Sequence, residues 1–273
     1  MIAVVTDSAA SLPRELATEL GIEVVPLYVR FGDEVHRDGE GGLDFYARLR
    51  GGETAGTAAP APGDFLAAFE RTGADQIVCV TVASSVSGAH VAASVAAGEL
   101  KGGRVEVVDS LNASMGQGFV AMEAARAVAR GASLGEAAAR ARDVAERVRL
   151  VATIDTFDFL RRSGRVGSLA AFAGSRLSIK PVFALARGEI GPVARPRTRA
   201  RALERVAAEA VSFAAGRPVH LAAVHADAEP EARALLQRIE SEVEVVESLI
   251  AEFTPAMGAH TGPGVVGVAS FSD

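Results

Sequence analysis

The feature that most constrains the fold is an apolar, β-branched run that ends in a cluster of serines. Residues 76–82 predict a buried strand, and the alanine-rich residues 89–100 that follow predict a helix. The short turn between them holds three serines and a glycine, Ser84, Ser85, Ser87 and Gly88. Because the first N–H groups of a helix have no partners within the helix, a turn of this kind predicts an anion site.

The chemistry of this turn points to a bound anion and not to a nucleophile. The turn offers hydroxyl and backbone N–H donors but no lysine, so it suits one carboxylate or phosphate held by hydrogen bonds and not by an ion pair. None of its serines stands in the Gly-x-Ser-x-Gly pattern of a nucleophile elbow, and no phosphate loop ending in Gly-Lys is present. The turn therefore indicates binding and gives no sign of catalysis.

The first half of the chain alternates predicted strands with predicted helices. Apolar runs predict strands over residues 2–6, 22–29, 76–82 and 105–108. Amphipathic or capped segments predict helices over residues 12–19 (with Ser11 as the cap), 43–50, 62–71, 89–100, 119–130 and 133–147. Residues 32–42 and 51–62 lack periodicity and predict loops. The alternation predicts an α/β domain over residues 1–148, with a doubly wound parallel sheet whose ligand lies at the carboxyl ends of the strands.

The second half is more mixed and predicts a separate α+β domain over residues 149–273. Residues 181–185 and 190–194 flank a glycine turn and predict a hairpin, and residues 169–177 predict a helix. Further strands are predicted over residues 150–154, 219–224, 243–249 and 265–271. Further helices are predicted over residues 156–162, over residues 199–214 and from residue 230 onward. Residues 258–264 predict a glycine-rich loop before the last strand.

Composition and charge argue against several classes of protein. The 273 residues carry a formal charge of −6, which opposes broad electrostatic binding of nucleic acid. The single cysteine, Cys79, lies in the apolar run and is predicted to be a core residue. The histidines form no close pair in a zinc-ligand context. No apolar run is long enough to span a bilayer, and the N-terminus lacks the basic start of a signal peptide. We therefore expect no metal, no membrane span and a cytoplasmic location.

Two further features are open to two interpretations each. His260 lies in the predicted glycine-rich loop, where backbone can approach a ligand, and is either a functional or a structural residue. Two basic groups are either partner-docking or phosphate-facing surfaces, or the solvated faces of a turn and of a helix start. They are Arg161, Arg162 and Arg165, and Arg195, Arg197, Arg199 and Arg201.

A set of short motifs, spread in order over nearly the whole chain, resembles the landmarks of the DegV family. The motifs are Asp7-Ser8, Thr57-x-x-Pro60, Ser84-Ser85-x-Ser87-Gly88, Ser163-Gly164-Arg165, Lys180-Pro181, Arg197-Thr198 and Gly258-x-His260-Thr261-Gly262. No single motif is specific, and their ordered combination carries the resemblance. It implies a two-domain α/β protein that binds one long-chain fatty acid between its domains.

The same resemblance implies a partner and a set of residue roles. It implies the fatty-acid-binding subunit of bacterial fatty acid kinase, in which a separate ATP-dependent subunit phosphorylates the carboxylate. The protein is then a lipid-binding carrier and not an enzyme, it has no cofactor, and it can contact a membrane transiently. Carried over by motif, the carboxylate ligands are Thr57 and Ser87 with His260 nearby, the supporting turn is Ser84, Ser85 and Gly88, and the docking residues are Arg165, Arg197 and Arg199.

This sequence departs from the family pattern at three points. Ala58, Ala59 and Ala61 replace the polar residues of the segment that is usually Thr-Ser-Gln-Pro-Ser. Ala89-His90 replaces the usual threonine and aromatic residue, and one residue instead of two separates the second and third serines of the turn. These changes alter the hydrogen-bonding groups near the head group.

The residues by themselves leave two other classes of function open. One is an enzyme that acts on a small carboxylated or phosphorylated metabolite, with His260 as acid and base. The other is a regulator that binds nucleic acid through the arginine groups, which the acidic total and the scarcity of aromatic residues oppose. A long apolar cavity would favour the carrier, and a short polar pocket would favour the enzyme.

Overall fold

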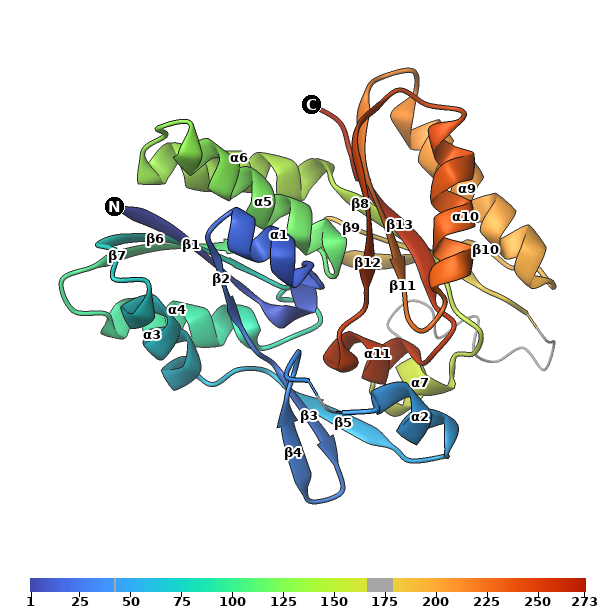
Figure 1. The fold of residues 1–273 in the computed structure, drawn as a ribbon, viewed down its shortest axis with the longest axis horizontal. Coiled ribbons are helices and arrows are strands. Elements are labelled where there is room, and N and C mark those ends of the chain that lie inside the picture. The colour runs from blue at the N-terminus through green and yellow to red at the C-terminus, as the bar shows by residue number, and fades with distance from the viewer. Residues whose placement is uncertain (42, 166–178) are drawn as a thin grey trace.

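The computed structural model describes residues 1–41, 43–165 and 179–273, and three β-sheets form its framework within these ranges (Figure 1). The first sheet is parallel, in the order β2-β1-β6-β7. Its strands are β1 (Ile2–Asp7), β2 (Ile22–Val25), β6 (Gln76–Thr81) and β7 (Arg104–Asp109). The central strand β6 is buried on both faces from its second residue onward, which is why residues 77–80, including Cys79, are all apolar. The predicted parallel sheet is confirmed.

Helices cover both faces of this sheet (Figure 1). Helices α3 (Pro62–Arg71) and α4 (Ala89–Glu99) pack below it in the view, and α5 (Met115–Ala129) and α6 (Leu134–Arg147) pack above it. Helix α6 begins with a capping box, in which the N–H groups of Ser133 and Glu136 donate to each other's side chains. Helix α5 is buried along almost its whole length, because it contacts strands of the first and the second sheet.

The second sheet is mixed and has six strands in the order β10-β9-β8-β13-β11-β12. They are β8 (Arg149–Thr153), β9 (Val182–Ala186), β10 (Glu189–Ala194), β11 (Val219–His225), β12 (Val245–Glu252) and β13 (Val266–Phe271). Strands β9 and β10 form the predicted antiparallel hairpin. Helices α9 (Arg199–Ala214) and α10 (Glu229–Glu240) pack on this sheet and share a core with it.

Each half of the chain therefore contributes a sheet of the predicted kind. The division at residues 148 and 149 stays a prediction. The helix predicted over residues 169–177 lies outside the described residues. None of the described helices combines the length and the apolar character that crossing a membrane requires.

A third, small sheet is not predicted by the sequence. It is antiparallel, in the order β4-β3-β5, with β3 (Tyr28–Phe31), β4 (Glu34–Arg37) and β5 (Ala55–Ala58). The prediction of one strand over residues 22–29 is wrong, because Pro26 follows β2 and the chain then enters the small sheet as β3. The loops predicted over residues 32–42 and 51–62 are wrong in part, since they contain β4 and β5.

Helix α1 (Arg14–Glu19) starts later than predicted, and Ser11 does not cap it. Pro13 stands at the cap position. Ser11 instead closes the short helix η1 (Ser8–Ala10): its N–H donates to the Ser8 carbonyl and its φ is 50°. That left-handed backbone turns the residue away from the start of α1, and its hydroxyl has no hydrogen-bond partner among the described residues.

The glycine-rich segment near the C-terminus is a helix over its first part and not the predicted loop. Helix α11 (Pro255–Thr261) packs against α7 (Asp158–Arg162) and α2 (Phe45–Arg50). A Cβ at Gly258 would stand 2.8 Å from atoms of Phe45 and Tyr46. Gly262, which ends the helix with φ +76°, would place a Cβ 2.3 Å from the Phe159 ring. These glycines let neighbouring helices approach α11.

Candidate functional site

An apolar cavity of about 280 Å³ lies between the carboxyl ends of the parallel strands and strands β8, β9 and β10. Residues of both halves of the chain line it. The apolar ones are Ala9, Leu27, Ala59, Val82, Val86, Ala113, Leu150, Ala152, Leu160, Phe183, Leu185, Ile190, Phe253, Ala256 and Met257. Its position is the one expected for a ligand of a doubly wound sheet. Its wall suits a flexible aliphatic chain.

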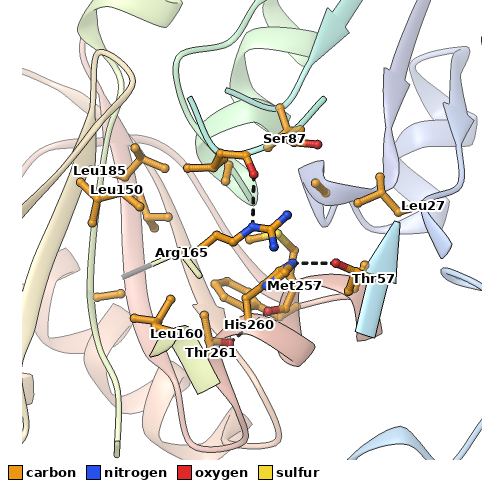
Figure 2. Close-up of a pocket in the computed structure, with 18 of the residues that line it drawn as sticks. Leu27, Thr57, Ser87, Leu150, Leu160, Arg165, Leu185, Met257, His260 and Thr261 are labelled. Atoms are coloured by element: carbon orange, nitrogen blue, oxygen red, sulfur yellow. Dashed lines mark hydrogen bonds between the residues drawn. The ribbon is translucent and has the colours of Figure 1, made fainter. Parts of the chain in front are cut away.

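The polar side chains of the cavity gather on one side (Figure 2). Thr57 and His260 are joined by a hydrogen bond, and the guanidinium of Arg165 lies between this pair and Ser87 in the view. Leu150 and Leu185 lie away from them, toward the mixed sheet. The structure thus brings together the three residues that the sequence predicts as carboxylate ligands, Thr57, Ser87 and His260.

The backbone holds Ser87 at the start of α4. The N–H of Ala89 donates to Ser87 Oγ over 3.3 Å, so the Ser87 hydroxyl keeps its own hydrogen for a ligand. Gly88 precedes the first helical residue, and its exposed backbone borders the cavity. Half-buried Ser87 and the unpaired N–H groups of the first turn can therefore meet one anion.

Buried Asp7 fixes the strand ends from which this turn leaves. Its carboxylate accepts hydrogen bonds from the N–H groups of Val82, at 2.8 Å, and of Ala9, at 3.1 Å. Burial raises the pKa of Asp7 to about 6. The aspartate of the Asp7-Ser8 motif therefore ties the end of β1 to the residue that follows β6.

Ser84 and Ser85 are exposed and lie outside the cavity wall, where they hold the turn from behind. The N–H of Ser84 donates to the Asp109 carboxylate, at 3.2 Å from Oδ2. The hydroxyl of Ser85 donates over 2.6 Å to the carbonyl of Gly188, in the turn between β9 and β10. The turn is thereby fixed to both the parallel and the mixed sheet.

Thr57 and His260 form the polar contact at the centre of the site. Thr57 lies on β5 opposite Val29 of β3, and not in a loop, and His260 lies in the last turn of α11. Thr57 Oγ1 and His260 Nε2 are 2.9 Å apart, and His260 Nδ1 has no hydrogen-bond partner among the described residues. When Nε2 carries the hydrogen, the imidazole donates to Thr57, and the Thr57 O–H is free to donate to a ligand.

Helix α11 is placed by a buried pair, of which the sequence motifs single out Ser8 but not Asp38. The Ser8 hydroxyl donates to the Asp38 carboxylate over 2.6 Å, and this carboxylate accepts the N–H of Ala256 over 2.9 Å. Ser8 Oγ also accepts the N–H of Leu27 over 2.9 Å. The serine of the Asp7-Ser8 motif therefore anchors the first turn of the helix that carries His260.

His260 is neutral at neutral pH. Burial, reinforced by the positive charge of Arg165, lowers the pKa of His260 from its ordinary value of 6.5 to about 4. A neutral imidazole has one donor and one acceptor nitrogen. The contact with Thr57 is therefore available over the whole physiological pH range.

This depressed pKa predicts a pH dependence of folding that His260→Gln removes. Between pH 6.5 and pH 4 the unfolded state binds the proton of His260 more readily than the folded state, so stability falls as the pH falls. We expect the free energy of unfolding of the wild type, relative to His260→Gln, to decrease by up to about 3 kcal/mol over this interval. Urea denaturation at several pH values measures it. Asp7 titrates in both proteins, so its contribution cancels in the difference between their free energies of unfolding. A difference that does not change with pH would contradict the neutral, buried imidazole.

Arg165 supplies a positive charge that the sequence does not predict for this site. Its Nη1 donates to the Ser163 carbonyl over 2.6 Å, and its Nε lies 3.5 Å from the Val86 carbonyl. It reaches the cavity from the turn after α7, so no pattern near the serines could reveal it. The serine turn itself has no cation, but the cavity beside it is lined by one, Arg165.

The other two predicted docking arginines lie outside the cavity wall. Arg199 is half-buried, pairs with Glu231 and lies 3.8 Å from a carboxylate oxygen of Asp155. Arg197 is exposed just before α9, and the neighbouring Thr198 caps this helix. The structure therefore separates Arg197 and Arg199 from the Thr57, Ser87 and His260 group.

Of the three alanines that depart from the family pattern, one borders the cavity. Ala59 lines it, and Ala58 is exposed. Ala61 precedes α3, where its N–H donates to the Asp64 carboxylate over 2.8 Å. The departure at Ala59 adds apolar surface next to Thr57.

Comparison with known proteins assigns the whole chain to one group. The family described as "Uncharacterised protein, DegV family" matches residues 1–273. A DegV domain-containing protein of Streptomyces coelicolor is 36% identical over 273 residues, which cover 98% of this chain and 97% of the relative. Protein DegV of Bacillus subtilis is 32% identical over 275 residues, which cover 98% of both chains.

Solved structures are similar over the same extent. A DegV family protein from Thermus thermophilus, described by its fatty acid binding, superposes with a TM-score of 0.93 at 32% identity, and the match covers 100% of this chain and 99% of that one. DegV of Bacillus subtilis, described as a fatty acid binding protein, gives a TM-score of 0.89 at 30% identity, with the same coverage. The predicted two-domain α/β fold is thereby confirmed.

Proposed function

Because this chain belongs to the DegV family over its whole length, we propose that it binds one long-chain fatty acid in the apolar cavity. The carboxylate lies at Thr57 and Ser87 with His260 behind Thr57, and the acyl chain extends toward Leu150 and Leu185. The observation that carries the proposal is the junction of an aliphatic cavity with a small group of hydroxyl donors. The fatty-acid binding named for the Thermus and Bacillus relatives supports it.

The apolar wall supplies the driving force for the acyl chain. Each methylene removed from water gains about 0.8 kcal/mol, so about fifteen methylenes give a large gross term, most of which ordering and association costs offset. The side chains toward the mixed sheet, such as Phe183 and Leu185, offer no hydrogen bond that a small polar metabolite would need. The cavity therefore favours the carrier over the enzyme as the function of this site.

The hydroxyl groups hold the head group at the polar side of the cavity. A carboxylate is costly to bury without hydrogen bonds, and Thr57 and Ser87 each have an O–H to donate. Thr57 is free to donate when neutral His260 donates its Nε2 hydrogen to the Thr57 oxygen. In this scheme His260 orients a ligand and performs no chemistry.

The chemistry on the bound acid belongs to a partner. We place the protein in the bacterial cytoplasm, where it presents the carboxylate to a separate ATP-dependent kinase subunit. A carboxylate oxygen then bonds to the terminal phosphorus of ATP, the bond from that phosphorus to ADP breaks, and an acyl phosphate forms. Arg165 borders the head group, and Arg197 and Arg199 are candidate docking residues for the partner.

Lipid extraction from the purified protein tests the proposal. We expect native mass spectrometry to show a bound species that organic extraction identifies as a long-chain fatty acid, in a ratio of one per chain. The delipidated protein should take up palmitate or oleate again. A protein that is consistently empty and binds neither acid would refute the proposed function.

A further inference from the structure

A second hollow, lined by three arginines, shares a wall with the apolar cavity. It measures about 410 Å³, and Arg30, Arg162 and Arg165 are among the residues that line it. We call it the arginine pocket. Thr57, Arg165 and His260 line both spaces, so the hydrogen-bonded pair of Thr57 and His260 stands at their common boundary. A chemical group that is attached to the head group and extends past Thr57 and His260 enters the arginine pocket.

The guanidinium groups of the arginine pocket lack counter-charges. No Asp or Glu stands among the described residues that line it, and within the described chain none of its three arginines forms an ion pair. Arg162 instead lies over the Phe159 ring, with its guanidinium carbon 5.0 Å from the ring centroid. Many other arginines of the described chain are in ion pairs: Arg48, for example, holds both Glu34 and Glu53. Three guanidinium groups without carboxylate partners that line one space make it a favourable place for an anion from outside.

The charge of the arginine pocket selects the class of that anion. Three guanidinium groups exceed what a single carboxylate needs, and the carboxylate already has its donors at Thr57 and Ser87. Planar guanidinium forks match the oxygens of a phosphate dianion, which carries more charge than a carboxylate and more oxygens to accept their N–H groups. His260 adds no positive charge at neutral pH, because its pKa is about 4. The charge of the pocket therefore suits a phosphoryl group.

We propose that the arginine pocket binds the phosphoryl group that is joined to the bound fatty acid when its carboxylate becomes an acyl phosphate. The inference rests on the proposed function and adds a site to it. With the acyl chain in the apolar cavity, the phosphorus attached to the carboxylate oxygen must point away from the chain, past Thr57 and His260. The apolar part of the cavity cannot accept a dianion, and the arginine pocket is an adjoining space that shares Thr57 and His260 with it. Its exposed members Arg30 and Arg162 also leave it open to a partner that delivers the group.

The test compares two ligands that share one tail. One is palmitate, and the other is the β-ketophosphonate of palmitate, in which CH₂ replaces the bridging oxygen of the acyl phosphate. Calorimetry measures both with the delipidated wild type and with Arg30→Gln combined with Arg162→Gln. Arg165 is left in place because it also lines the apolar cavity. The control combines Arg130→Gln with Arg217→Gln, which removes the same charge from exposed arginines outside both spaces.

We expect the pocket variant to bind the β-ketophosphonate at least about 10-fold more weakly, because it loses two charge-assisted contacts, and to bind palmitate within about 2-fold of the wild type. The control should change neither affinity by more than about 2-fold. Normal palmitate binding with an unchanged β-ketophosphonate affinity would overturn the pocket and leave the proposed function standing. Failure of the wild type to bind palmitate would instead refute the proposed function.

Inorganic phosphate and ATP distinguish the source of the phosphoryl group. With the palmitate-loaded wild type, ³¹P line broadening of either ligand that is lost in the pocket variant would show that the pocket also takes phosphate from solution or from the nucleotide. No broadening, together with the weakened β-ketophosphonate, would assign it to the acyl phosphate alone. Both results support a phosphoryl site.

Discussion

A protein that carries both Thr57→Val and Ser87→Ala is expected to bind palmitate at least about 100-fold more weakly than the wild type. Each hydroxyl donates a hydrogen bond to an ionised carboxylate in the proposed complex, and such a bond contributes about 1.5–3 kcal/mol. Valine keeps the shape of Thr57, and alanine removes only the Ser87 oxygen. The acyl chain keeps its cavity, so the loss reports the head group. Calorimetry with the delipidated protein measures the affinity.

A matched variant removes the same groups elsewhere. Thr18→Val combined with Ser94→Ala deletes a threonine and a serine hydroxyl that bond only to carbonyls of their own helices, away from the cavity. This protein should bind palmitate as the wild type does. Urea denaturation checks that both proteins are folded, since the first also loses the contacts with His260 and with the Ala89 N–H. Unchanged palmitate affinity in the Thr57 and Ser87 variant would mean that the head group lies elsewhere.

The parallel sheet could be predicted because strands that are buried on both faces have apolar sequences. Strand β6 and its neighbours are covered by helices on both faces, so residues 77–80 form an unbroken apolar run. Strand β4 has the opposite property: its residues are largely exposed, with Val35 61% exposed, and β5 is built of small residues. Their pairing with β3 depends on tertiary contacts, and no local alternation of apolar and polar residues indicates it.

Helix α11 shows how a local signal can be outweighed. Thr254 followed by Pro255 is a typical helix start, and the structure has Pro255 as the first helical residue. The glycines at 258 and 262 favour a loop when only the sequence is considered. They are tolerated because Phe45, Tyr46 and Phe159 pack in the space that side chains there would occupy.

Some residues of the site can be predicted from sequence motifs, and others can be assigned only from tertiary contacts. Thr57, Ser87 and His260 follow from the order of the family motifs, and the structure brings them together. Asp38, which holds α11, and Arg30, which lines the arginine pocket, sit in polar or alternating segments that resemble any exposed strand or loop. Their roles depend on partners that the fold supplies, so the sequence alone could not assign them.

The length of the bound chain is expected to respond to a change at the apolar side of the cavity. Leu185 is 4% exposed and lines the cavity on the side away from Thr57 (Figure 2). Leu185→Phe places about three more carbon atoms in the space of the acyl chain, which displaces about three methylenes of the ligand. At about 0.8 kcal/mol for each methylene, palmitate should bind about 50-fold more weakly.

A short acid separates this effect from general damage to the protein. We expect the shorter chain of octanoate to end before the altered side chain, so Leu185→Phe should leave its affinity within about 2-fold of the wild type. Leu20→Phe, at a half-buried leucine that does not line the cavity, should change neither acid. If Leu185→Phe weakened palmitate and octanoate equally, the acyl chain would not run toward the mixed sheet. If it weakened neither, the acyl chain would lie outside this cavity, because a larger side chain in a closely packed cavity must weaken a ligand that fills the same volume.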